Sequence, residues 1–200
     1  MKVIGITGLI GSGKSVVMKL FGILYDIPTF NSDLKAKEIY YDSDIREKII
    51  RKLGIDPITD EGSLNKDGLR QLVTGDAHMK NELETIVHNG LKEKFQSWVE
   101  RQTSDSVIIE SAILYTSGFH RFCDQIIQVT AKETTREARV LSRDNSMTIE
   151  RFQQIVDIQR EEAIRQANES NFTINNDGDI SIVQQVENTY EKICKRNFKQ

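Results

Sequence analysis

Short hydrophobic runs alternate with longer amphipathic runs along the 200 residues of this chain. The short runs are rich in β-branched residues and predict buried strands at Lys2–Thr7, Ile27–Asn31, Val107–Ser111, Gln125–Thr130 and Phe172–Asn175. Helical spacing predicts helices over Ser15–Leu24, Leu34–Tyr41 and Ser181–Arg196. This alternation predicts an α/β fold, in which helices provide right-handed crossovers between the strands of a five-stranded, mostly parallel sheet.

Two insertions interrupt the alternation, so we expect one unit whose core comprises about 1–33, 105–131 and 167–200. The first insertion, about 34–104, carries apolar residues at three- and four-residue steps: Leu83, Ile86, Val87, Leu91, Phe95 and Val99. The second, about 132–166, is charged. Its second half has an apolar stripe of Ile149, Phe152, Ile155 and Val156.

Composition narrows the class of protein. The chain has 27 Lys and Arg against 30 Asp and Glu, a net charge of −3, which argues against a protein that coats nucleic acid. Cys123 and Cys194 form no disulfide framework, which is typical of a reducing compartment. No run approaches 18 apolar residues and no export signal is visible. We therefore expect a cytoplasmic globular protein that binds neither nucleic acid nor membrane, and composition predicts no oligomeric state.

Residues 8–15, Gly-Leu-Ile-Gly-Ser-Gly-Lys-Ser, match the phosphate-loop pattern G-x-x-x-x-G-K-[ST] between a predicted strand and helix. Glycines let successive N–H groups point at phosphate oxygens, and the helix that follows adds the positive end of its dipole. We expect Lys14 to reach the β- and γ-phosphates and Ser15 to ligate Mg²⁺. The predicted ATP-binding residues are Gly11, Ser12, Gly13, Lys14, Ser15 and Val16. The alternative is a glycine-rich turn without a ligand.

Other sequence motifs indicate which class of phosphate-loop protein this chain belongs to. The only candidate for a guanine-reading Asn-Lys-x-Asp segment is residues 65–68, which has glycine where aspartate is needed. No Leu-Ser-Gly-Gly-Gln-like transporter signature is present, and the chain is short for a motor protein. A small-molecule kinase is therefore favoured, and it needs a group that orients the acceptor hydroxyl and positive charge over the transferred phosphoryl group.

Two carboxylates follow predicted strands. Asp33 stands at the carboxyl end of the second strand, where it is suited to orient or deprotonate an attacking hydroxyl, or to cap the next helix. Glu110 ends the third strand, where it is suited to hold a metal-bound water or to cap the next turn. Position alone leaves both pairs of roles open.

The second insertion supplies positive charge. Arg139 and Arg143 are four residues apart on one predicted helical face, which fits a lid over the γ-phosphate. The alternative is a solvated face paired with Glu133, Glu137 and Asp144. In the first case Lys14 and the arginines of 136–165 would converge on one phosphate-bearing crevice.

These motifs together resemble the dephospho-coenzyme A kinase family over nearly the whole chain. Residues 6–15 resemble T-G-G-I-G-S-G-K-S, and Asn31-Ser32-Asp33 resembles D-A-D. Residues 83–88 resemble L-E-x-I-x-H, and 110–115 resemble D-x-P-L-L-F. Residues 139–144 resemble R-x-x-x-R-D, Gln159 matches a later glutamine, and 170–178 resemble A-D-x-V-I-x-N-x-G. Departures from the family pattern are Asn31, Asn89, Glu110, Ala112 and Asn171.

The resemblance implies a P-loop kinase fold with an acceptor-binding insertion at 34–104 and a lid at 132–166. It implies phosphorylation of the ribose 3′-hydroxyl of dephospho-coenzyme A by ATP and Mg²⁺, the last step of coenzyme A synthesis. Asp33, Lys14 and Arg139 would be catalytic, Arg143 and Asn176 would bind ATP, and Asp33, His88 and Glu110 would contact the acceptor. For His88 a structural, hydrogen-bonded role is the alternative. The alternative functions are another small-molecule or nucleoside monophosphate kinase, or a nucleotide-dependent switch.

Overall fold

The computed structural model describes residues 1–195, which form two compact units. One unit contains Met1–Asn31 and the chain from Gln102 onward, and the other contains Ser32–Arg101. The second unit occupies the stretch in which the first insertion is predicted. The predicted helix end at Arg196 and the last part of the predicted core segment 167–200 lie outside the described residues.

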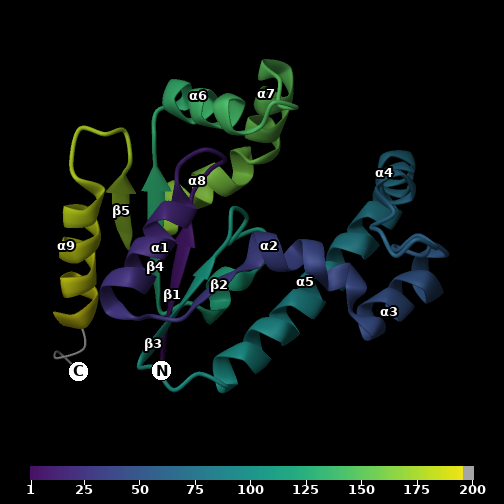
Figure 1. Cartoon of the computed structure of the whole chain (residues 1–200), viewed down its shortest axis with the longest axis horizontal. Helices are drawn as coiled ribbons and strands as arrows, with labels where there is room; N and C mark the ends of the chain where they lie inside the picture. Colours follow the sequence, from purple (N-terminus) through teal and green to yellow (C-terminus); the bar gives the residue numbers. More distant parts are fainter. Residues whose placement is uncertain (196–200) are drawn as a thin grey trace. The chain divides into compact units, whose positions relative to one another are not determined.

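The first unit is built on a five-stranded sheet in the order β2-β3-β1-β4-β5 (Figure 1). Its strands are β1 (Lys2–Thr7), β2 (Thr29–Asn31), β3 (Ser106–Glu110), β4 (Gln125–Thr130) and β5 (Phe172–Asn175). All neighbouring pairs are parallel, so the predicted fold class is confirmed. Strand β2 starts later than predicted, after Pro28, which has no N–H to donate to a ladder.

The strand register brings three carboxyl ends together. Glu110, the last residue of β3, is paired with Asn31 at the end of β2 and with Ile6 near the end of β1. Because side chains beyond the carboxyl ends of parallel strands share one edge of the sheet, this edge is where an open α/β sheet places a ligand.

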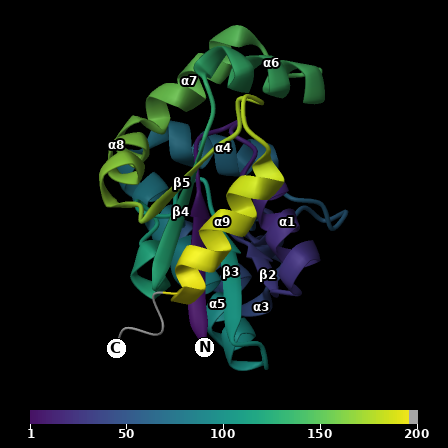
Figure 2. The ribbon, with the colours of Figure 1, turned by 90° about the vertical axis from the view of Figure 1, so that its left-hand side faces the viewer.

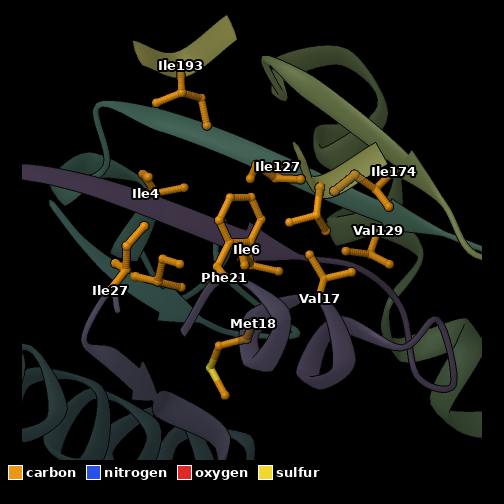
Figure 3. Close-up of a cluster of buried hydrophobic side chains, with 12 residues drawn as sticks. Ile4, Ile6, Val17, Met18, Phe21, Ile27, Ile127, Val129, Ile174 and Ile193 are labelled. Atoms are coloured by element: carbon orange, nitrogen blue, oxygen red, sulfur yellow. The ribbon is translucent and has the colours of Figure 1, made fainter. Parts of the chain in front are cut away.

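A buried apolar cluster joins the sheet to helices α1 (Lys14–Tyr25) and α9 (Ile182–Lys195). Figure 3 shows Val17 and Phe21 of α1 and Ile193 of α9 around Ile4 and Ile6, which alternate along β1. Phe21 has no exposed surface, and burial of such a side chain stabilises the fold by about 1.5–3 kcal/mol. This packing fixes α1, and hence the loop before it, on β1.

Three helices make up most of the second predicted insertion: α6 (Glu133–Arg143), α7 (Ile149–Ile158) and α8 (Arg160–Glu169). In Figures 1 and 2, α6 and α7 lie beyond the carboxyl ends of β4 and β5, and α8 runs from α7 back toward the start of β5. Phe152 is fully buried, as its apolar stripe predicts, but Ile149 is 53% exposed. Ile149 is the first residue of α7, so it lies at the end of the helix rather than over a packed face. In α9, Val183 is likewise exposed although its spacing matches the buried stripe.

The second unit is helical. It contains α2 (Ser32–Glu38), a 3₁₀ turn over Ile39–Tyr41, α3 (Ser43–Leu53), α4 (Lys66–Gly75) and α5 (Ala77–Glu100). The predicted helix Leu34–Tyr41 is therefore divided, because its last turn tightens to 3₁₀ geometry.

The predicted stripe of α5 forms the core of this unit. Leu83, Ile86, Val87, Leu91 and Phe95 are all buried, whereas Val99 is only partly buried. A side chain at Gly90 would collide with Ile45, so glycine lets α3 and α5 approach closely. Asp42 caps α3 and receives a 2.6 Å hydrogen bond from Lys94 of α5, which lowers the pKa of the Asp42 carboxyl. Within residues 1–195, no helix is both long and apolar enough to cross a membrane.

Candidate functional site

The phosphate-loop motif lies between β1 and α1, as predicted. Gly11 and Gly13 have φ values of 78° and 93°, which glycine adopts without strain. Gly13 is the N-cap of α1 and has no side chain with which to cap it. No N-cap side chain therefore covers the start of α1, where the positive end of the helix dipole favours an anion.

Polar side chains are buried within this loop. Lys14 is only 8% exposed and Ser12 only 1%. The Ser12 hydroxyl is buried and, among residues 1–195, has no hydrogen-bond partner. Val16, by contrast, is 50% exposed in the first turn of α1 and its N–H donates to the Gly13 carbonyl over 3.0 Å, so its contact with ATP stays a prediction. A buried lysine and an unsatisfied hydroxyl at the start of a helix are suited to phosphate oxygens.

Glu110 lies directly beside the phosphate loop. Its Oε1 accepts a 2.9 Å hydrogen bond from the Ser15 hydroxyl, and its Oε2 accepts a 2.6 Å hydrogen bond from the Asn31 amide. Glu110 is 2% exposed. Because the Ser15 hydroxyl is the donor in its hydrogen bond to Glu110, the lone pairs of the Ser15 oxygen remain for a cation. One hydroxyl and one carboxylate suit Mg²⁺, which keeps several waters and binds mainly through substrate phosphates.

Helix α6 and the start of α8 contact the outer side of the phosphate loop. The Ile10 N–H donates to Gln159 Oε1 over 3.0 Å, and the Ile10 carbonyl accepts from Arg136 Nη1 over 3.2 Å. Arg136 also lies over the Phe152 ring, with its guanidinium carbon 5.8 Å from the ring centroid. Burial lowers the pKa of Arg136, and nearby Glu133 partly offsets this. An arginine nevertheless stays charged in a protein, so the loop carbonyl faces a cation.

Arg139 and Asn176 meet at the same loop. Arg139 donates to the carbonyl of Asn176 over 2.7 Å and to that of Gly11 over 3.4 Å. The Asn176 amide donates to the Ser12 carbonyl over 2.9 Å. A side chain at Gly13 would collide with that amide. The structure thus brings together two residues that sequence reasoning assigned separately to catalysis and to ATP.

The other arginines of the second insertion do not all reach this loop, which corrects the expectation that they converge. Arg143, the last residue of α6, is exposed, and its predicted contact with ATP stays a prediction. Arg160 pairs with Asp157 on the surface at 3.0 Å. Arg165 pairs with Glu169 at 2.8 Å and lies over the Tyr115 ring, so it braces the segment after β3.

That segment is held by a buried carboxylate that sequence reasoning missed. Glu162 is 1% exposed and accepts hydrogen bonds from the N–H groups of Tyr115 and Thr116 over 2.9 and 2.8 Å. One helical turn later, Gln166 donates to the Thr7 hydroxyl at the end of β1 over 2.8 Å. Helix α8 therefore ties the chain after β3 to the strand that leads into the phosphate loop. The repeating charge pattern of α8 contained no signal for this, because Glu162 is typical of a solvated helix face.

Two predicted site residues belong to the second unit. Asp33 lies in the first turn of α2, which begins at Ser32, so it is not the N-cap of that helix. It follows the end of β2 by two residues in the chain. His88 lies on α5, and burial lowers the pKa of its imidazole. Their roles toward a ligand stay predictions.

The family model and the related proteins that match this chain all point to the same family. A family model described as dephospho-CoA kinase matches residues 2–181. The dephospho-CoA kinase of Porphyromonas gingivalis is 34% identical over 176 residues, 88% of this chain and 86% of that protein. That of Bacteroides fragilis is 32% identical over 184 residues, 92% of this chain and 88% of that protein.

Solved structures show the same fold at lower identity. The crystal structure of TT1252 from Thermus thermophilus has a TM-score of 0.79 at 24% identity, covering 98% of this chain and 97% of that one. A dephospho-CoA kinase from Campylobacter jejuni has a TM-score of 0.65 at 18% identity, covering 98% of this chain and 100% of that one. These structures show the fold alone, whereas the sequence relatives and the family model show the family. From them it follows that this chain belongs to the dephospho-CoA kinase family.

Proposed function

We propose that this chain transfers the γ-phosphoryl group of ATP to the ribose 3′-hydroxyl of dephospho-coenzyme A, which yields coenzyme A and ADP. The observation that carries the proposal is a complete phosphate loop with its buried Lys14 in a chain that belongs to this kinase family. Phosphoryl transfer depends mainly on positioning and on electrostatic stabilisation. The role of each residue is therefore to hold a part of ATP, of the metal or of the acceptor in place.

The triphosphate binds at the start of α1. The backbone amides of residues 11–16 hold it, and the Lys14 ammonium neutralises charge on the β- and γ-phosphates. Asn176 lies at this loop, consistent with a place beside the nucleotide. Arg139 and Arg143 bring positive charge to the phosphoryl group from α6, and Arg139 already lies against the loop at Gly11.

Ser15 and Glu110 hold the metal end of the site. Magnesium, if bound with ATP, would supply positive charge that stabilises the charge on the phosphates. The Ser15 hydroxyl, which donates a hydrogen bond to Glu110, would offer the lone pairs of its oxygen to the cation, and Glu110 would orient a water beside it. This is the role in holding a metal-bound water that the position of Glu110 suggested, whereas the family resemblance implied a contact with the acceptor.

Asp33 acts on the acceptor. Its carboxylate accepts or aligns the proton of the attacking hydroxyl, and its position two residues after β2 supports this role. The helical segment 34–104 receives the acceptor, with His88 among its contacts, and 132–166 acts as the lid. The core is 1–33, 105–131 and 167–200, and the enzyme works in the cytoplasm.

One experiment tests the function directly. ATP, Mg²⁺ and dephospho-coenzyme A are incubated with the chain, and the product is identified by mass spectrometry. We expect the mass gain of one phosphoryl group on the ribose. Parallel reactions with nucleoside monophosphates and with no acceptor test the alternatives. Phosphorylation of a monophosphate in preference to dephospho-coenzyme A, or ATP hydrolysis without any acceptor, would overturn the proposal.

A further inference from the structure

Two side chains from the lid segment hold the polar groups of one phosphate-loop residue. The Ile10 N–H donates to Gln159, and the Ile10 carbonyl accepts from Arg136. Ile10 is 149 positions from Gln159 and 126 positions from Arg136 in the sequence. The contacts therefore arise only when α6 and α8 pack on the loop.

Both side chains are buried in making these contacts. Arg136 is 5% exposed and Gln159 is 7% exposed. Burial of a guanidinium has a large desolvation cost, and an apolar residue of similar volume often stabilises such a site equally well or better. Packing of α6 alone therefore does not require an arginine at this position. What the arginine adds is a charged donor directed at the loop carbonyl.

The contact between Arg136 and the Ile10 carbonyl also fixes the direction of the Gly11 N–H, which belongs to the same peptide group. A trans peptide is planar, so the Ile10 carbonyl and the Gly11 N–H point in opposite directions. Holding the carbonyl on Arg136 directs the Gly11 N–H away from α6. Gly11 permits this close approach, because a Cβ there would lie 2.5 Å from the Arg136 carbonyl oxygen.

We propose that Arg136 and Gln159 are positioning residues that hold the Ile10 peptide groups and so aim the Gly11 N–H at the triphosphate before ATP binds. This rests on the proposed function, in which the N–H groups of residues 11–16 bind the triphosphate. Neither residue touches the reacting atoms. Each acts through the loop backbone.

The test combines a binding measurement with amide exchange. Binding of the β,γ-imido analogue of ATP with Mg²⁺ is measured by calorimetry for R136M, Q159L and the wild-type chain. Loss of one well-formed hydrogen bond predicts binding weaker by about tenfold in each variant. R136K keeps a cationic donor and should restore most of the affinity. R160M and Q154L change an exposed arginine and an exposed glutamine of the same segment and should bind normally.

Hydrogen exchange of the Ile10 amide, measured without nucleotide, separates positioning from a general loss of structure. Q159L should speed this exchange about tenfold with little change in melting temperature. Q159E keeps an acceptor oxygen and should retain the protection. In steady-state kinetics, R136M and Q159L should raise KM for ATP and leave KM for the acceptor unchanged.

The outcomes are distinct. Wild-type affinity for the ATP analogue in both R136M and Q159L would overturn the inference. Equal weakening in R160M and Q154L would do so as well, because it would mean that any change in this segment has the effect. If R136M does not fold, Q159L still decides the question through its affinity for the analogue and the exchange of the Ile10 amide. Failure of the wild-type chain to bind the analogue would instead contradict the proposed function.

Discussion

The hydroxyl of Ser15 donates a 2.9 Å hydrogen bond to the carboxylate of Glu110, although the two residues are 95 positions apart in the chain. Ser15 lies in the first turn of α1 and Glu110 ends β3, so the contact joins the phosphate loop to the edge of the sheet. The second carboxylate oxygen is held by Asn31 from the neighbouring strand. In the proposed function, this arrangement would connect the binding of ATP with the binding of its metal.

Replacing Glu110 by glutamine should raise the Mg²⁺ concentration needed for half-maximal rate. The amide is nearly the same size but has no charge and only one acceptor oxygen, so it holds the Ser15 hydroxyl and a metal-bound water less strongly. Loss of such an outer ligand costs about 10–100-fold in metal affinity or activity. The rate is measured against Mg²⁺ at saturating ATP, with the exposed Glu161→Gln as control. An unchanged Mg²⁺ requirement would remove Glu110 from the metal site.

Asp33→Asn should lose most of the turnover and keep the affinity for ATP. Its amide cannot accept the proton of the attacking hydroxyl, and general base catalysis contributes about 10²–10⁴-fold to rate. Asp67→Asn is a matched control, because Asp67 occupies the first turn of α4 as Asp33 does that of α2. Turnover and ATP affinity are measured separately. Turnover like that of the wild-type chain would exclude Asp33 from the mechanism.

Lys14→Met should weaken ATP binding and turnover together. The methionine fills the buried space but removes the charge that we propose faces the β- and γ-phosphates. A charge-assisted hydrogen bond contributes about 1.5–3 kcal/mol, so binding should weaken by about 10–100-fold. Lys19→Met changes an exposed lysine of the same helix and serves as control. If Lys14→Met kept its rate, the assignment of the phosphate loop would be wrong.

Gly13→Ala should abolish nucleotide binding and destabilise the fold, whereas Gly54→Ala should only destabilise it. Both glycines have positive φ values, 93° and 69°, where alanine costs about 1–2 kcal/mol. At Gly54 the added methyl group meets no atom within 4 Å, but at Gly13 it collides with the Asn176 amide. Chemical unfolding and ATP titration of both variants check this. Normal ATP binding by Gly13→Ala would show that the loop can rearrange at no cost.

The buried position of His88 should make the folded chain less stable as the pH falls below neutrality. Burial holds the pKa of its imidazole below the ordinary value of 6.5, so the folded chain binds fewer protons than the unfolded chain just below pH 6.5. Its contribution is therefore fully present above that pH and is lost as pH falls through the folded pKa. His88→Gln should lose less stability than the wild-type chain between pH 7 and about pH 5. The free energy of unfolding is measured against pH for both chains. If it falls equally in the two, the pKa of His88 does not change on folding.

Much of the fold was accessible from local sequence pattern. Strands β1, β4 and β5 have their predicted bounds, and the phosphate loop lies between a strand and a helix as its motif requires. These features depend on residues close together in the chain, whose periodicity and glycine content act locally. Ile149 and Val183 mark the limit of such reasoning, since helical spacing predicts a stripe but not which of its members meets a packed surface.

The sequence by itself determined the class of the fold, the position of the phosphate loop and the family, because these rest on contiguous motifs. Only the tertiary structure decided which distant side chains complete the site. Arg136 and Gln159 reach Ile10, Asn31 reaches Glu110, and Arg165 turns to Tyr115 instead of the phosphate loop. In the sequence Arg136 and Arg165 are equivalent charges on amphipathic helices. Their different partners follow from the packing of α6 and α8 on the sheet edge, which no local pattern encodes.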